Sequence, residues 1–112
     1  MALKLNDTFS AINTQKTASN VRGNVQVRLG AGTSNDTTGA FTETQVGVVS
    51  IYVRSGSSSP AGAGSWMPLV TGVAVPAPLE FYFTDYMDLR VVLTALTTGA
   101  ALPVQVVDGS AA

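Results

Sequence analysis

The sequence predicts an all-β protein, a single-domain antiparallel β-sandwich or jelly-roll-like barrel with long Gly/Ser loops. Three observations predict this fold. Short runs of Val, Ile, Leu, Phe and Tyr alternate with polar residues, Gly-, Ser- and Pro-rich stretches separate the runs, and no window has the 3.6-residue period of an amphipathic helix. A chain of 112 residues is long enough for one hydrophobic core.

The chain divides into two parts by its pattern. Residues 1–20 are mostly polar without a sustained period, so we expect an extended N-terminal arm there and a β-sandwich domain over residues 21–112. The arm carries only isolated apolar residues, too few for a core of its own. We therefore expect the arm to be ordered by contact with a partner through Leu3, Leu5, Phe9 and Ile12.

The first strands of the body follow from their alternation. Residues 21–29 alternate apolar and polar and predict a half-buried strand. Residues 30–39 are turn formers and predict a long exposed loop. Residues 42–54 begin polar and become apolar on both faces, which is typical of a central strand or of one covered by a partner.

The middle of the body contains a second loop and two short strands. Residues 55–65, rich in Gly and Ser and interrupted by Pro60, predict an irregular loop. Residues 66–70 predict a short strand, which Pro68 confines to an edge or a strand end. After two further prolines, residues 79–83 alternate and predict another strand.

The last part predicts a turn and two more strands. Residues 85–88 are expected to turn the chain, residues 89–96 to form a strand, and residues 97–101 to close a hairpin into the strand 102–107. The inward positions of all these strands give the predicted core: Val25, Val27, Leu29, Val49, Ile51, Val53, Phe81, Phe83, Leu89, Val91, Leu93, Val104 and Val106.

The composition leaves few groups for catalysis. The chain has no Cys and no His, which removes disulfides, the usual zinc ligands and the commonest general base. We therefore expect no enzyme, with no catalytic, cofactor-binding or metal-binding residue. Asp85 and Asp88 form the closest carboxylate pair, and two interpretations stay open: hydrogen bonds to the backbone of a turn, which we favour, or a cation site.

Charge and hydropathy exclude two classes of partner. The net charge is -1 and the six basic residues are scattered singly, so we expect no nucleic-acid partner. No window approaches the roughly 18 apolar residues of a membrane span, and residues 1–16 lack the apolar region of a secretory signal. We expect a protein made in the cytoplasm that has no membrane partner.

The aromatic residues are the main candidates for binding in the body. Trp66, Tyr82 and Tyr86 suit stacking on sugars or anchoring an interface, although Trp66 also suits a core and Tyr86 a strand corner. Met67 suits a core or a subunit seam. The predicted partner-binding set is Leu3, Leu5, Phe9, Ile12, Trp66, Met67, Tyr82 and Tyr86.

The second half of the chain resembles a known class of protein. An apolar strand ending VSIYVRSG, a Gly/Ser loop, Trp66, a Pro-flanked LEFYF, DYMDLRVVLTA and a closing PVQVVDG follow in order. This order resembles the small β-sandwich cement or decoration proteins on the outside of tailed-bacteriophage capsids. The resemblance covers about half of the chain and implies a structural virion protein that binds the major capsid protein and reinforces contacts between its subunits.

Association and function follow as expectations. The apolar stretches 46–53 and 70–79 exceed what one thin sandwich can bury, so we expect a homo-oligomer, most of all a trimer or else a dimer. The expected location is the capsid surface of a virion assembled in the host cytoplasm. The alternative is a carbohydrate- or receptor-binding sandwich module of a phage tail fibre.

Overall fold

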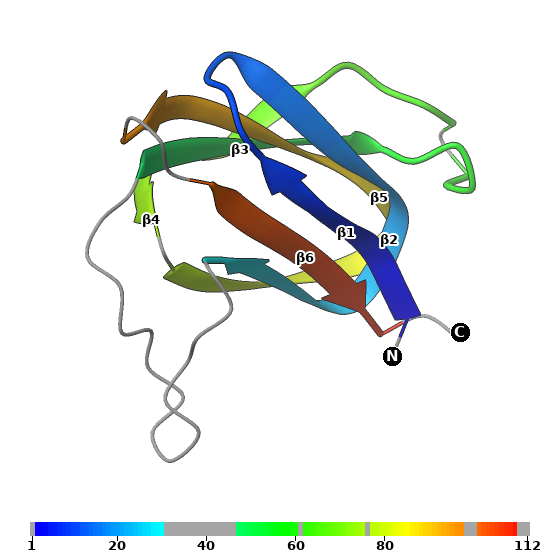
Figure 1. Ribbon diagram of the computed structural model, residues 1–112. Helices are drawn as coiled ribbons and strands as arrows, with labels where there is room; N and C mark the ends of the chain where they lie inside the picture. Colours follow the sequence, from blue (N-terminus) through cyan, green and yellow to red (C-terminus); the bar gives the residue numbers. More distant parts are fainter. Residues whose placement is uncertain (1, 31–46, 61, 76, 98–100, 110–112) are drawn as a thin grey trace.

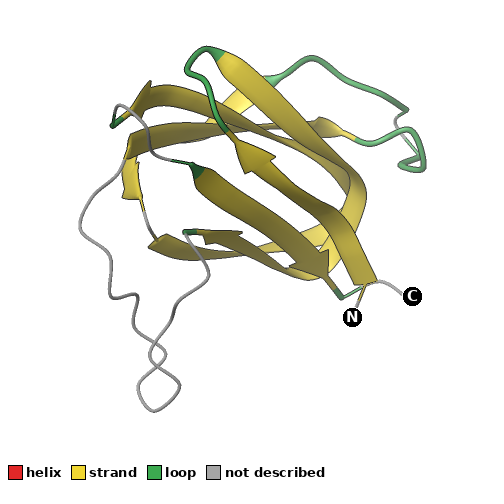
Figure 2. Cartoon of the chain, in the orientation of Figure 1, coloured by secondary structure: helices red, strands yellow, loops and turns green. Residues whose placement is uncertain are grey.

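The described residues of the protein form one antiparallel sheet of six strands (Figure 1). The computed structural model describes residues 2–30, 47–60, 62–75, 77–97 and 101–109. These contain strands but no helix, which confirms the all-β prediction (Figure 2). The strands are β1 (Ala2–Phe9), β2 (Thr14–Leu29), β3 (Gly47–Ser55), β4 (Met67–Val75), β5 (Ala77–Leu96) and β6 (Leu102–Asp108), in the sheet order β1-β6-β2-β5-β3-β4.

Two long strands connect the two halves of this sheet. The second half of β2 pairs with β6 and with the first half of β5, as in the pair Val25↔Phe81. The first half of β2 pairs with the second half of β5, which pairs in turn with β3. Because β2 and β5 belong to both halves, the sheet curls over its own inner face (Figure 1).

The curl is located at irregularities of the β2–β5 pairing. The register shifts between Ala18 and Val21 and again between Val21 and Gly23. Asn20 and Gly23 have positive φ angles of 55° and 75°, a region that Asn and Gly adopt more readily than other residues. Bulges of this kind bend a strand and increase its twist, so the second half of each long strand can cross to the other side of the core.

One hydrophobic cluster fills the inner face of the curled sheet. Alternation identified most of it correctly, while Val53, Phe81 and Phe83 are only partly buried and pack against its margin. The buried apolar residues outside the prediction lie near the bend, in β1 or at strand ends, where alternation gives little signal: Ala2, Phe9, Ala18, Val21, Val75 and Leu102.

The expected arm belongs to the sheet. Residues 2–9 form β1, which pairs with β6 from Ala2↔Asp108 to Phe9↔Leu102, and residues 14–20 are the first part of β2. Phe9 is 1% exposed. The prediction that residues 1–20 form an extended arm ordered mainly by a partner is therefore wrong for the described residues 2–20, because the edge of β6 provides backbone partners for β1.

Two further boundaries differ from the expectation. Residues 85–88 do not turn the chain, since β5 continues through them, and the short strand expected from Trp66 begins at Met67 and continues to Val75. The loop expected over residues 30–39 lies outside the described residues except for Gly30. The same holds for the start of the strand expected over residues 42–54 and for the centre of the hairpin at residues 97–101.

Candidate functional site

The predicted partner-binding residues do not form one surface. Leu3 in β1, Ile12 in the β1–β2 turn, Met67 in β4 and Tyr82 in β5 are exposed, and Met67 and Tyr82 are the most open, at 65% and 67%. Their strands lie in different parts of the sheet. Sequence reasoning selected accessible side chains at these positions, but the sheet distributes them over several faces.

Three other members of the predicted set are less accessible. Phe9 is in the core, so its assignment to partner binding is wrong. Leu5 is partly buried and packs against the core cluster. Tyr86 is partly buried at the bend of β5, and the guanidinium Cζ of Arg22 lies 5.2 Å from the centre of its ring. Tyr86 thus lies at a bend of the strand and contacts Arg22 through its ring.

Trp66 lies just before β4 and contacts two arginines. The Cζ atom of Arg90 in β5 is 4.0 Å from the centre of the indole ring, and the Cζ atom of Arg54 in β3 is 4.6 Å from it. Arg90 alternates with the buried Leu89 and Val91, so this cluster is on the outer face of the sheet. Cation–π contacts of this kind hold a guanidinium in a fixed orientation.

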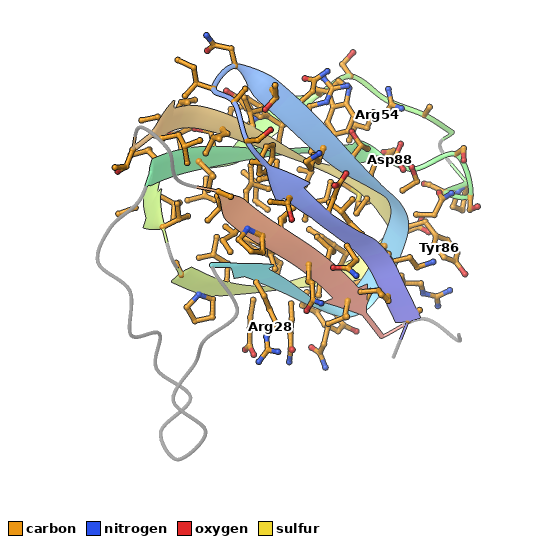
Figure 3. The ribbon with its side chains drawn as sticks, in the orientation of Figure 1. Arg28, Arg54, Tyr86 and Asp88 are labelled. Atoms are coloured by element: carbon orange, nitrogen blue, oxygen red, sulfur yellow. The ribbon has the colours of Figure 1, made fainter. Side chains whose placement is uncertain are left out.

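Asp88 accepts hydrogen bonds from Arg54 of this cluster and from the backbone of β2. Its carboxylate is 4% exposed and accepts a hydrogen bond from Arg54 Nε at 2.9 Å and one from the backbone N–H of Asn20 at 3.0 Å. Arg54 and Asp88 are directly opposite each other in the β3–β5 register, and Figure 3 shows the two side chains close together. The carboxylate thus orients Arg54 and supplies an acceptor to the bulge of β2.

The Gly/Ser loop between β3 and β4 is bonded to the bend at several points. The Gly56 N–H donates to the carbonyl of Tyr86 at 2.9 Å, and the Ser58 N–H donates to Asn20 Oδ1 at 3.1 Å. The Ser59 hydroxyl donates to Asp85 Oδ2 at 3.0 Å. These bonds position the loop that leads to Trp66, although its composition predicted only an irregular segment.

The Asp85 and Asp88 carboxylates bind groups of the protein. Asp85 Oδ1 accepts the N–H of Tyr86 at 2.7 Å, in addition to the bond from Ser59 at Oδ2. Both oxygens of Asp88 also accept hydrogen bonds. Within the described ranges there is no group of three or more His, Cys, Asp or Glu side chains that could hold a metal ion. Both carboxylates accept backbone N–H groups, as the favoured interpretation expected, but they do so within the continuous strand β5 and not in a turn.

Arg90 differs from Arg54 in its partners. The ion pairs of the described segments are Lys16–Asp7 and Arg54–Asp88, so Arg90 has no carboxylate partner there. Its Nε atom is buried and has no hydrogen-bond partner among the same residues. The side chain as a whole is half-buried, so it reaches the surface beside Trp66. The cluster therefore has two guanidinium groups and one carboxylate.

Strand β4 forms an apolar edge of the sheet. It pairs with β3 on one side and is the last strand in the order. Most of its residues are exposed, and it has no charged side chain. The register shifts between Val70 and Val73, where Gly72 has a φ of 68° and donates its N–H to Ser50 Oγ at 3.3 Å. Another chain could pair with the free backbone N–H and C=O groups of this uncharged edge strand and could bury the exposed side chains of Met67 and Leu69.

A second exposed surface lies around Tyr82 in the first half of β5. Tyr82 is opposite Asn24 in the β2–β5 register, and Glu80 is opposite Gln26. These polar residues alternate with Phe81 and with Val25, which face the core. The outer face of this half of the sheet thus combines one open aromatic ring with amide and carboxylate groups.

The sequence analysis missed Arg54 and Arg90 as members of a site, and it considered Asp88 only together with Asp85, as a turn residue or a cation ligand. The proximity of Arg54, Asp88 and Arg90 depends on β3 lying beside β5, which the sequence did not specify. No helix in the described part of the chain is long and apolar enough to cross a membrane.

Comparison of the chain with protein-family models, with curated proteins and with solved structures finds no match.

Proposed function

We propose that this protein is a structural virion protein that binds the outer surface of a phage capsid and reinforces contacts between major capsid subunits. The observation that supports it best is the edge strand β4, which is uncharged, apolar and largely exposed. Exposed apolar edges of this kind associate with other chains, and Met67 and Leu69 supply side chains that a partner would bury. The resemblance of residues 46–107 to capsid cement proteins supports the same function.

The proposal includes association with the major capsid protein and with further copies of this chain. Residues 47–53 contribute less exposed apolar surface than their sequence suggested, because each of them is buried or partly buried in β3. Among the described strands, β4 has two large exposed apolar side chains, Met67 and Leu69, while Leu3 in β1 and Ile12 in the β1–β2 turn are exposed elsewhere. We assign this edge to the capsid protein, and we expect a different surface to join the copies, with a trimer favoured over a dimer.

Cosedimentation with capsids assembled without this protein tests the proposal. The wild-type protein should pellet with the capsids and saturate at a fixed number of copies per shell. The double variant Met67→Lys, Leu69→Lys should remain in the supernatant, because two charges would be placed against apolar partner surface. Gln15→Lys adds a charge at an exposed position of β2 and should pellet as the wild type does. Equal pelleting of all three proteins would contradict the proposal.

A second candidate function is carbohydrate binding by a phage tail-fibre module. Tyr82 favours it, because an open ring beside Asn24 and Glu80 is the combination of stacking and hydrogen bonding that sugars need. Trp66 is the weaker platform, since guanidinium groups already lie against its ring. Binding on a glycan array that Tyr82→Ala abolishes and Trp66→Phe preserves would favour this function over capsid attachment.

A further inference from the structure

We propose that Arg90 and Trp66 form a binding site for a carboxylate, and that its natural occupant is an Asp or Glu side chain on the docked protein surface. This inference rests on the proposed function for one point only, the identity of the partner that supplies the carboxylate. The carboxylate chemistry itself rests on the Arg54, Trp66, Asp88 and Arg90 cluster alone.

The charges of the cluster are unbalanced. The Asp88 carboxylate accepts hydrogen bonds from Arg54 Nε and from the Asn20 N–H. It therefore pairs with Arg54 and not with Arg90. Arg90 has no ion-pair partner in the described segments, and its buried Nε has no acceptor there. The Nε atom is too buried for another chain to reach, so a carboxylate would bind the part of the half-buried guanidinium that reaches the surface and would neutralise its charge.

The geometry suits a planar anion. A guanidinium offers parallel N–H groups that match the two oxygens of a carboxylate, and this match depends on a fixed orientation of the fork. The Trp66 ring, 4.0 Å from Arg90 Cζ, packs against this guanidinium and restricts its movement. Arg54 is held beside it by Asp88 and contributes a second positive charge near the same ring.

The charge balance favours a carboxylate over a phosphate. The two arginines and Asp88 sum to one positive charge, which one monoanion neutralises. A phosphate dianion would bring excess negative charge close to the buried Asp88 carboxylate. The site also directly precedes the edge strand that begins at Met67, so a partner that lies along β4 would bring its own side chains to Arg90.

Trp66 is the single tryptophan of the chain and reports on the site directly. We would titrate the isolated protein at neutral pH with sodium acetate and, separately, with sodium phosphate, at constant ionic strength maintained with sodium chloride. Acetate should change the Trp66 fluorescence in a saturable manner, with half-saturation below that of phosphate. A response no different from that to chloride, or tighter binding of phosphate than of acetate, would overturn the carboxylate assignment.

Arginine variants show which side chain binds the acetate that changes the Trp66 fluorescence. Arg90→Gln should weaken acetate binding about tenfold or more, the loss expected for charge-assisted hydrogen bonds. Arg28→Gln, at an exposed position of β2 far from Arg54 in Figure 3, should leave half-saturation unchanged. Arg90→Lys keeps the charge without the fork and should also weaken binding, which provides the test if the Gln variant does not fold. Wild-type affinity in the Lys variant would overturn the role of the fork.

Acetate titration and capsid cosedimentation of the same wild-type and variant proteins test this inference and the proposed function separately. If acetate does not bind but the wild-type protein still cosediments with capsids, the carboxylate site is wrong and capsid attachment stands. If acetate binds through Arg90 but capsids are not bound, the site stands as an anion site and its assignment to a capsid side chain is wrong.

Discussion

The Asp88 carboxylate accepts the backbone N–H of Asn20 at 3.0 Å, across 68 positions of sequence, at the point where the two longest strands bend. Asp108 makes a similar bond to the N–H of Arg22 at 2.9 Å and is fully buried. A bulge leaves backbone donors without ladder partners, and here two buried carboxylates accept them. The curl of the sheet therefore depends on specific polar side chains as well as on the core.

Replacing Asp88 by Ala should destabilise the fold by about 2 kcal/mol, because it leaves the Asn20 N–H and the Arg54 guanidinium without their acceptor. Chemical denaturation of the variant and the wild type gives the difference in unfolding free energy. Asp7→Ala, at an exposed ion pair, should destabilise the fold much less, because exposed ion pairs contribute little to stability. Equal losses in the two variants would show that Asp88 has no special role.

Gly47 should not tolerate a side chain. A Cβ atom there would lie 2.3 Å from the carbonyl oxygen of Ala95, within the β3–β5 pairing. Gly47→Ala should therefore lower the unfolding free energy by about 1–3 kcal/mol, as overpacking does elsewhere. Gly64→Ala would meet its nearest atom at 3.5 Å and should be nearly neutral. Thermal unfolding of both variants checks this contrast, which a stable Gly47→Ala protein would contradict.

The hydrogen bond from Lys16 Nζ lowers the pKa of Asp7 below its ordinary value, and the Thr8 N–H contributes in the same direction. A lowered folded-state pKa makes the ion pair favourable above the unfolded pKa of Asp7, and this contribution is lost as pH falls through the folded pKa. Lys16→Met should raise the Asp7 pKa, as measured by NMR titration of its carboxyl carbon. An unchanged value would mean that Lys16 does not hold the carboxylate in solution.

The alternation over residues 25–29 of β2, 49–51 of β3 and 104–106 of β6 predicted core residues correctly, because one face of each segment lies on the hydrophobic cluster. The same signal failed at Asp85–Asp88. Two aspartates around Tyr86 and Met87 are typical of a turn, yet here they accept hydrogen bonds beside a bulge, and β5 continues through them. Such a strand cannot be told from two shorter ones without knowing which backbone donors lie opposite.

The arm and the site were missed for a related reason. Polar residues 2–9 have little core signal, and their place in the sheet follows from the free edge of β6, which comes about a hundred residues later. Arg54 and Arg90 are far apart in sequence and meet at Trp66 only through the strand order. Trp66 and Met67 could be selected from residue type and loop context alone, whereas their neighbours could not.

Light scattering tests the predicted self-association separately from capsid binding. The wild-type protein should be a homo-oligomer by light scattering at micromolar concentration, with a trimer expected before a dimer. Because we assign β4 to the capsid protein, Met67→Lys, Leu69→Lys should leave this mass unchanged. A wild-type monomer would contradict the predicted oligomer, and conversion of an oligomer to a monomer by the double variant would mean that β4 joins copies of this chain.

Amide hydrogen exchange of the protein, free and bound to capsids, tests the docking edge most directly. The N–H groups of β4 that do not bond to β3 should exchange readily in the free protein, because no strand of the described residues lies beyond this edge. On capsids, β4 should become protected while β1, the opposite edge, keeps its free-state exchange. Unchanged exchange in β4 with protection in β1 or around Tyr82 would contradict the account.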